Sequence, residues 1–235
     1  MTTSTIFPVK YLIVIDGNIG VGKTSLLNEL TNRSSELLGS LASNCSFLTE
    51  PVEKFSFFQY QKQCFDPLKE LYQQTAETCM IQDYILNQSY DQFSNAKKID
   101  PEKPVLICER GILSSHPFIS TYYQLGKMSD FSAAYLHHKT DSLWSSVLVE
   151  PILIIYLDLP IEEAKSRIQV RQRDSEKCGI SDQFLTLLDY NLREFYQKLG
   201  STHKICVNQI KLEPSWPVAK VAERVAKSIS HHIVI

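Results

Sequence analysis

The chain has 235 residues, of which 43% are hydrophobic and 21% are charged, and its formal net charge at pH 7 is −2. This balance is typical of a globular fold with one sizeable core, and the weak net charge argues against a nucleic-acid-binding surface. No apolar run approaches the ~20 residues of a membrane-spanning helix, so no membrane span is expected.

The N-terminal stretch MTTSTIFPVK lacks both the apolar segment of a signal peptide and the Arg-rich pattern of a transit peptide. The six cysteines are scattered and form no C-x-x-C pair, which is typical of reduced thiols. We therefore expect an intracellular, cytoplasmic protein, and we interpret residues 1–235 as a single domain.

The first predicted element is a buried strand, Tyr11–Ile15, which stops at Asp16. The next eight residues, Gly17, Asn18, Ile19, Gly20, Val21, Gly22, Lys23 and Thr24, match the pattern G-x-x-x-x-G-K-[ST] and precede a helix-forming segment. Glycines let backbone N–H groups turn inward around phosphate oxygens, and the helix N-terminus adds partial positive charge. Lys23 can reach the β- and γ-phosphates, and Thr24 can offer its hydroxyl to Mg²⁺. The segment 17–24 therefore predicts a phosphate-binding loop for a nucleoside triphosphate.

The rest of the chain alternates short apolar runs with helical patterns. Continuous apolar runs predict buried parallel strands at Ser46–Thr49, Val105–Cys108, Ile152–Leu157 and Lys204–Val207. Helical periodicity predicts helices at Ser25–Leu41, Ser56–Tyr72, Ala76–Lys97, Met128–Val147, Ile161–Arg171, Asp182–Leu199 and Val218–His231, with a break near Gln73–Thr75 and Pro217 at a first helical position. This alternation predicts an α/β fold, a doubly wound parallel sheet of about five strands flanked by helices, with ligands at the carboxyl ends of the strands.

Charged residues follow three of these strands. They are Glu50 in TEP, Glu109 and Arg110 in CERG, and the arginines 167, 171 and 173 beyond Asp158. Taken singly, each suits a strand terminator, a surface ion pair or a solvated helix end, and Asp158 is interpreted as a strand terminator or helix N-cap. Phosphoryl transfer needs a phosphate cradle, Mg²⁺, positive charge on the moving group and a base. Together, after a phosphate-binding loop, these residues favour a phosphotransferase.

The strings GNIGVGKT, TEP, CERG, PILIIYLDLP and R-x-x-x-R-x-R-x-x-E together resemble the deoxynucleoside kinases, from about Tyr11 to Leu199. That family includes mitochondrial-type thymidine kinases, deoxycytidine and deoxyguanosine kinases, and insect and some viral deoxynucleoside kinases. The resemblance implies a P-loop kinase that uses ATP and Mg²⁺ to phosphorylate the 5′-hydroxyl of deoxynucleosides in nucleotide salvage for DNA synthesis. It also implies a homodimer.

The resemblance implies roles for residues at the phosphate end. Glu50 matches the carboxylate that takes the proton from the 5′-hydroxyl, and Arg110 matches the arginine beside that position. Glu109 matches an acidic group near Mg²⁺, beside Thr24, while Lys23 matches the phosphate-binding lysine.

The resemblance also implies an Arg-rich lid over about residues 167–179. Arg167, Arg171 and Arg173 match the arginines that close on the ATP phosphates, and Glu176 ends the motif.

For the nucleoside, the resemblance implies that Gln82 pairs with the base through an amide that is both donor and acceptor. Tyr72 matches the tyrosine that touches the sugar 3′-hydroxyl. The branch that handles deoxycytidine and purines carries an Arg and an Asp where this chain has Ile85 and Ser115. A lone buried charge is costly, so the absence of both predicts a preference for thymidine and other pyrimidines.

Two positions depart from the family pattern. Gly111 replaces the Ser that usually follows the Glu-Arg pair, and the Glu that binds the 3′-hydroxyl falls on Arg193. A slipped register would restore the carboxylate through Glu194, so either Glu194 or Tyr72 is expected to read that hydroxyl.

Two alternatives stay open. A nucleoside monophosphate kinase such as thymidylate kinase shares the fold, but usually has D-x-x-G-K where this chain has Asn18–Val21. A GTP-binding switch would need an N-K-x-D guanine reader, which the sequence lacks.

Overall fold

The computed structural model describes residues 9–73, 77–99, 102–146, 152–171, 180–201 and 205–233. Its centre is a parallel sheet in the order β2-β5-β1-β6-β7. In that order the strands are Cys45–Leu48, Val105–Glu109, Tyr11–Gly17, Ile152–Asp158 and Ile205–Lys211. Because the first strand of the chain lies in the middle, the sheet is doubly wound. The predicted fold class is confirmed.

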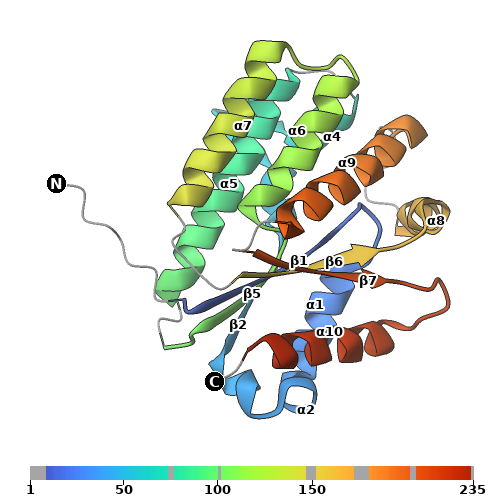
Figure 1. The fold of residues 1–235 in the computed structure, drawn as a ribbon. Helices are drawn as coiled ribbons and strands as arrows, with labels where there is room; N and C mark the ends of the chain where they lie inside the picture. Colours follow the sequence, from blue (N-terminus) through green and yellow to red (C-terminus); the bar gives the residue numbers. More distant parts are fainter. Residues whose placement is uncertain are drawn as a thin grey trace.

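Helices cover both faces of the sheet, as Figure 1 shows. One face carries α1 (Lys23–Asn32), α2 (Ser34–Leu38) and α10 (Val218–His232). The other face carries α5 (Thr78–Ile99), α6 (Ser115–Gln124), α7 (Asp130–Ser145) and α9 (Asp182–Gly200). The helix α8 (Ile161–Arg171) follows β6.

The alternation of side chains along β1 explains why both faces are covered. Ile13 and Ile15 pack into the core with α1 and α10, whereas Leu12 and Val14 pack into the core with α5, α6, α7 and α9. All four side chains are at most 3% exposed. A strand that is apolar on both sides requires helices on both sides.

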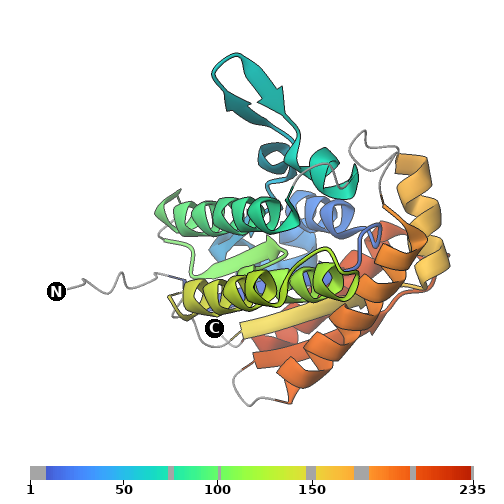
Figure 2. The same ribbon diagram turned by 90° about the horizontal axis from the view of Figure 1, so that it is seen from above.

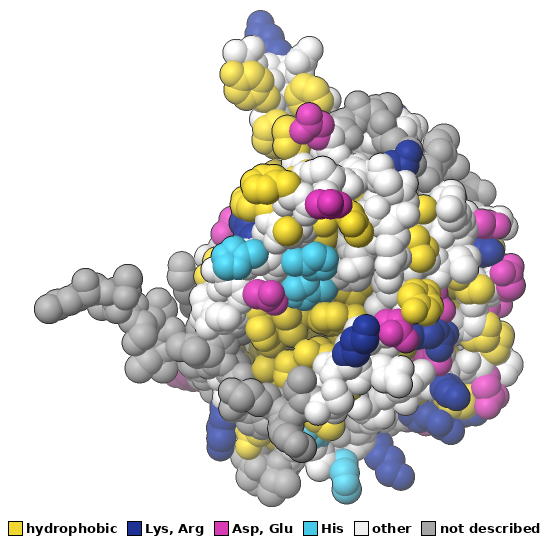
Figure 3. Space-filling view, turned by 45° about the horizontal axis from the view of Figure 1, so that its top comes forward, with side chains coloured by type: hydrophobic (Ala, Val, Ile, Leu, Met, Phe, Trp, Pro, Cys, Tyr) yellow, Lys and Arg dark blue, Asp and Glu magenta, His cyan; other side chains and the backbone are white. Residues whose placement is uncertain are grey.

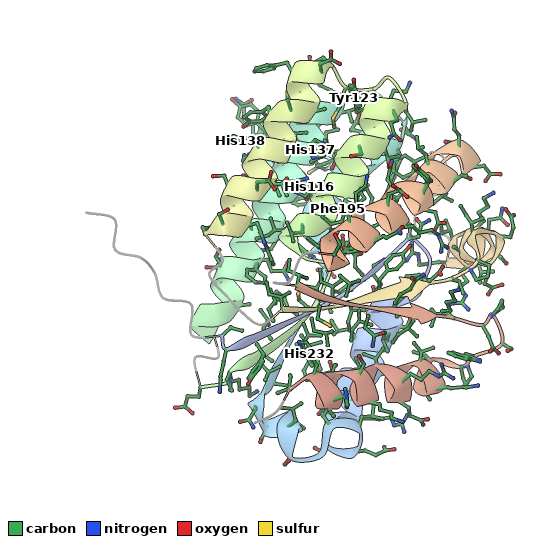
Figure 4. All side chains as sticks on the ribbon, in the orientation of Figure 1. His116, Tyr123, His137, His138, Phe195 and His232 are labelled. Atoms are coloured by element: carbon green, nitrogen blue, oxygen red, sulfur yellow. The ribbon has the colours of Figure 1, made fainter. Side chains whose placement is uncertain are left out.

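The helices α6 and α7 are joined by a histidine pair. The Nδ1 atoms of His116 and His137 lie 2.7 Å apart, and the ring of Phe195 from α9 lies 5.4 Å from that of His116. Figure 4 shows these three side chains gathered between their helices.

Among the helices in the described ranges, none is both long enough and apolar enough to cross a membrane.

The helix predicted over Ser56–Tyr72 is wrong in its first part. After α3 (Val52–Phe55) the chain forms an antiparallel hairpin of β3 (Phe58–Tyr60) and β4 (Gln63–Phe65), and only then α4 (Pro67–Gln73). Aromatic residues favour strands, and Gln61 makes the turn with φ 53. Figure 2 shows the hairpin projecting from the body of the molecule.

Other helix predictions need smaller corrections. The segment predicted as one helix over Ser25–Leu41 is α1, α2 and a 3₁₀ turn at Gly39–Asn44, because the helix breaks at Arg33. The helix α6 is not among the predicted elements, and Pro217 lies at the N-cap of α10 rather than inside it. The remaining helices agree closely with their predictions, whereas most of the break predicted near residues 73–75 lies outside the described residues.

Candidate active site

The carboxyl ends of β1, β2 and β5 border a cavity of about 280 Å³. Charged and hydroxyl side chains form one group in its lining, namely Lys23, Thr24, Glu50, Glu109 and Arg110. A second group from α4, α5 and α6 is mostly aromatic, apolar or uncharged, and includes Leu71, Tyr72, Gln82, Ile85, Ser115, Phe118 and Tyr122. The cavity therefore has a charged region and a region suited to a flat, largely uncharged group.

The loop 17–22 between β1 and α1 needs glycine at particular positions. Gly20 has φ +83, and a Cβ there would lie 2.5 Å from the carbonyl oxygen of Ala164 in α8. Gly22 has φ +98 and directly precedes α1. Side chains at these positions would clash or strain the backbone. The first residues of α1, Lys23 to Ser25, line the cavity, so the N-terminus of this helix borders it, as anion binding requires.

Lys23 is held inside the loop. The residue is 5% exposed. Its ammonium donates to the carbonyl oxygens of Gly17 at 3.1 Å and Asn18 at 2.9 Å. Burial lowers the pKa of Lys23 to about 8, Arg110 acts in the same direction, and Asp16 opposes both. The Asn18 amide ties the loop to α9 by donating to the carbonyl oxygen of Leu185 at 3.2 Å. These contacts hold Lys23 and Asn18 in place within the loop.

Thr24 and Glu109 bring hard oxygen donors together. The Thr24 hydroxyl donates to the Glu109 carboxylate at 2.7 Å, and the other carboxylate oxygen lies 3.4 Å from the backbone nitrogen of Glu50. Hydroxyl and carboxylate oxygens are the ligands that Mg²⁺ prefers in proteins. The donor set therefore fits a magnesium ion beside the phosphate loop.

Arg110 links two carboxylates. Its Nε lies 3.2 Å from the Glu50 carboxylate and its Nη1 lies 3.2 Å from Asp16, while its guanidinium lies 4.8 Å above the Phe118 ring. The Arg110 backbone has φ 56, a strained conformation of the kind that clusters at functional sites. Burial raises the pKa of Glu50, with Arg110 and then Lys23 opposing the shift. A raised pKa suits a carboxylate that accepts a proton during a reaction.

Asp16, at which the predicted strand Tyr11–Ile15 stops, contacts residues from several parts of the fold. The fully buried carboxylate accepts hydrogen bonds from the Gly17 N–H at 2.7 Å, the Ser114 hydroxyl at 2.6 Å and the Tyr196 hydroxyl. Together with Arg110, these contacts join the phosphate loop to the end of β5, to the 3₁₀ turn Ile112–Ser114 before α6, and to α9. An acidic residue directly between a buried strand and a glycine-rich loop is the one sequence signal for this role.

At the uncharged region, four predicted residues come together. Gln82, Ile85, Tyr72 and Ser115 all line the cavity. Gln82 is 6% exposed, and its amide makes no hydrogen bond within the described chain. A buried amide facing a cavity is available to a ligand.

The structure does not bring Arg193 or Glu194 to the cavity. The Glu194 carboxylate pairs with Lys198 at 3.4 Å on the surface of α9. The Arg193 guanidinium donates to Asp158 at 2.8 Å and to Asp189 at 2.8 Å. Asp158 is the last residue of β6, as its interpretation as a strand terminator expects, and it is also a partner of Arg193.

The predicted lid is described only in part. Arg167 lies over the phosphate loop, with Nη1 3.5 Å from the Val21 carbonyl oxygen and Nε 2.8 Å from the Glu163 carboxylate. Arg171 lines the cavity. Arg173 and Glu176 lie outside the described residues, as does the rest of the predicted lid beyond Arg171.

Two curated relatives support the resemblance to deoxynucleoside kinases that the sequence motifs indicate. A deoxyguanosine kinase from Dictyostelium discoideum is 27% identical over 202 residues, which is 85% of this chain and 64% of the relative. A deoxyadenosine kinase from the same organism is 27% identical over 188 residues, which is 80% of this chain and 67% of the relative. The chain thus spans about two thirds of the length of these two proteins.

Solved structures share the fold. A deoxyadenosine kinase from M. mycoides with bound dCTP has a TM-score of 0.68 at 20% identity, covering 94% of this chain and 100% of that one. The same enzyme with bound dATP has a TM-score of 0.69 at 20% identity, and the match covers 94% of this chain and 99% of that one. A family model described as deoxynucleoside kinase matches residues 13–233. Because this match takes in nearly the whole chain, the protein belongs to the deoxynucleoside kinase family.

Proposed function

We propose that this protein transfers the γ-phosphoryl group of ATP to the 5′-hydroxyl of a deoxynucleoside. One observation carries the proposal: the Glu50–Arg110 pair lies in the same cavity as the phosphate loop, with Lys23 and Thr24 beside it. A carboxylate of raised pKa held next to a phosphate site is the arrangement that deprotonates a hydroxyl nucleophile.

The reaction follows from these positions. Glu50 takes the proton of the 5′-hydroxyl, the oxygen attacks the γ-phosphorus in line, and the bond to the β-phosphate oxygen breaks. Lys23, Arg110 and the arginines 167, 171 and 173 offset the charge on the phosphoryl group. Thr24 and Glu109 would hold Mg²⁺, which neutralises charge on the phosphate oxygens when it is bound.

We also propose that thymidine is the preferred nucleoside. Ile85 and Ser115 line the cavity beside Gln82, so the base meets no charged side chain at these positions. The Gln82 amide can pair with N3–H and O4 of thymine. The relatives are named for deoxyguanosine and deoxyadenosine, and these purines are therefore the competing substrates to measure.

Radiolabelled ATP, incubated with the purified protein and a panel of four deoxynucleosides and their monophosphates, tests these proposals. We expect a labelled 5′-monophosphate, with the highest kcat/KM for thymidine. Phosphorylation of a monophosphate instead would indicate a nucleoside monophosphate kinase, and ATP hydrolysis with no acceptor would favour a switch. A purine at the top of the ranking would contradict the interpretation of Ile85 and Ser115.

We propose a homodimer on the basis of exposed aromatic side chains. Tyr123 of α6 is 44% exposed, and Phe131 and Tyr135 of α7 are 80% and 44% exposed. Figure 3 shows hydrophobic side chains beside the histidines on this face. Exposed apolar surface of this kind often marks a protein interface. Light scattering with size-exclusion chromatography should give twice the 26.9 kDa chain mass, and a monomer would contradict the proposal.

A further inference from the structure

The hydroxyl of Tyr122 is a buried polar atom that the cavity wall leaves without a partner. Tyr122 lies on α6, lines the cavity and is 3% exposed, and its hydroxyl makes no hydrogen bond within the described residues. Buried polar groups are nearly always paired, and leaving one unpaired costs free energy. A ligand that presents an oxygen at this point would satisfy the Tyr122 hydroxyl.

Tyr122 shares one wall of the cavity with Tyr72. Both rings pack on Phe184 of α9, at 5.0 Å for Tyr122 and 6.4 Å for Tyr72. Burial raises the pKa of Tyr122 well above its ordinary value, and Tyr72 adds to the shift, so Tyr122 stays a neutral donor. Gln82 and Ile85, in contrast, reach the cavity from α5.

The proposed function puts the 5′-hydroxyl of a deoxynucleoside at Glu50 and its base at Gln82, so that its sugar would lie between these two residues. The side chains that line the same cavity include Tyr72 and Tyr122. Neither Arg193 nor Glu194 is available there, because their side chains pair with Asp158 and Lys198. We propose that the Tyr122 hydroxyl donates a hydrogen bond to the sugar 3′-oxygen, beside Tyr72, and thereby selects substrates that carry this oxygen. This inference rests on the proposed function.

Tyr122→Phe tests the inference because it removes only the hydroxyl. With thymidine, kcat/KM should fall about tenfold, the value of one good hydrogen bond. With 3′-deoxythymidine it should stay unchanged, so the preference for thymidine over 3′-deoxythymidine shrinks by that factor. Tyr123→Phe on the exposed neighbouring residue and Glu194→Gln on α9 serve as matched controls that should leave both values unchanged.

Thermal unfolding gives a readout besides activity. Ligand-free Tyr122→Phe should melt at or above the wild-type temperature, because the variant no longer buries an unsatisfied hydroxyl. The rise in Tm with saturating thymidine should be smaller than in the wild type, and the rise with 3′-deoxythymidine should be equal.

Two outcomes would overturn the inference. In the first, Tyr122→Phe leaves the preference for thymidine over 3′-deoxythymidine unchanged. In the second, kcat/KM falls equally for both nucleosides and the Tm of the ligand-free variant is lowered, which would indicate a packing role. A wild-type protein that phosphorylates no deoxynucleoside would instead overturn the proposed function, and the binding comparison by Tm would still decide the role of Tyr122.

Discussion

The charged and uncharged regions of the cavity differ in whether their polar groups have hydrogen-bond partners within the protein. In the charged region, Lys23 and Arg110 already have hydrogen-bond partners within the protein. In the uncharged region, the Gln82 amide and the Tyr122 hydroxyl have none within the described chain. The charged region thus resembles a preorganised electrostatic site, which acts on a reaction without rearranging. The uncharged region gains its selectivity from the ligand that completes its hydrogen bonds.

Among substitutions in the charged region, Glu50→Gln should have the largest effect on kcat. The amide keeps the shape of the side chain but cannot accept the proton, so kcat should fall by about 10²–10⁴-fold while nucleoside binding persists. Steady-state kinetics gives the rate, and calorimetry with thymidine gives the affinity. Lost binding with normal turnover of the bound complex would exclude Glu50 as the base.

Lys23→Ala and Arg110→Ala should each reduce kcat by about 10²–10³-fold, because each removes positive charge where negative charge develops. Lys165→Ala provides the control, since Lys165 lies on α8 and pairs with Glu162 at the surface. Kinetics with ATP and thymidine measures all three variants. A Lys23→Ala enzyme with nearly wild-type turnover would refute the assignment of the phosphate loop.

Gln82→Leu, in the uncharged region, should change the kinetics for the nucleoside and not the KM for ATP. The substitution keeps much of the side-chain volume but loses two hydrogen bonds to the base, so kcat/KM for thymidine should fall about tenfold to hundredfold. The KM for ATP should stay near the wild-type value. If the KM for ATP rises and the nucleoside ranking is unchanged, Gln82 does not contact the base.

The pH profile of kcat/KM should be bell-shaped. Glu50 must be deprotonated to act, and its raised pKa moves the acidic limb above the range of an ordinary glutamate. Lys23 must be charged, and its pKa of about 8 places the alkaline limb near pH 8. Beyond either limb the rate falls about tenfold per pH unit. Glu50→Gln should remove the acidic limb, and an acidic limb that persists in this variant would belong to another group.

The sequence predicts what is encoded locally. The strands β1, β5 and β6 contain continuous apolar runs, and the phosphate loop has a fixed glycine spacing, so these could be predicted before any tertiary contact was known. The strand β7 continues to Lys211, beyond the predicted end at Val207, because its second half is more polar. The β3–β4 hairpin was not predicted, because its aromatic residues also fit a helical spacing and the strands pair only with each other.

The parts of the site that depend on distant contacts could not be predicted. Asp16 meets Ser114 and Tyr196, which lie 98 and 180 residues away in the chain. The directions of Arg193 and Glu194 depend on how α9 rotates against the sheet, which the sequence pattern alone does not fix. Gln82 lines the cavity, and its pairing with the base stays a prediction. Tyr122 carries no signal in the sequence, because a tyrosine on a helix looks like ordinary core.

The hairpin makes this protein suitable for an optical sensor. It connects α3 to α4, and both helices line the cavity through Val52, Phe55 and Tyr72. The hairpin carries an exposed thiol, Cys64. A dye attached there would report rearrangement of the cavity wall as fluorescence, without a label inside the cavity itself. The exposed Cys206 would be changed to serine first, so that among the described cysteines Cys64 takes most of the dye.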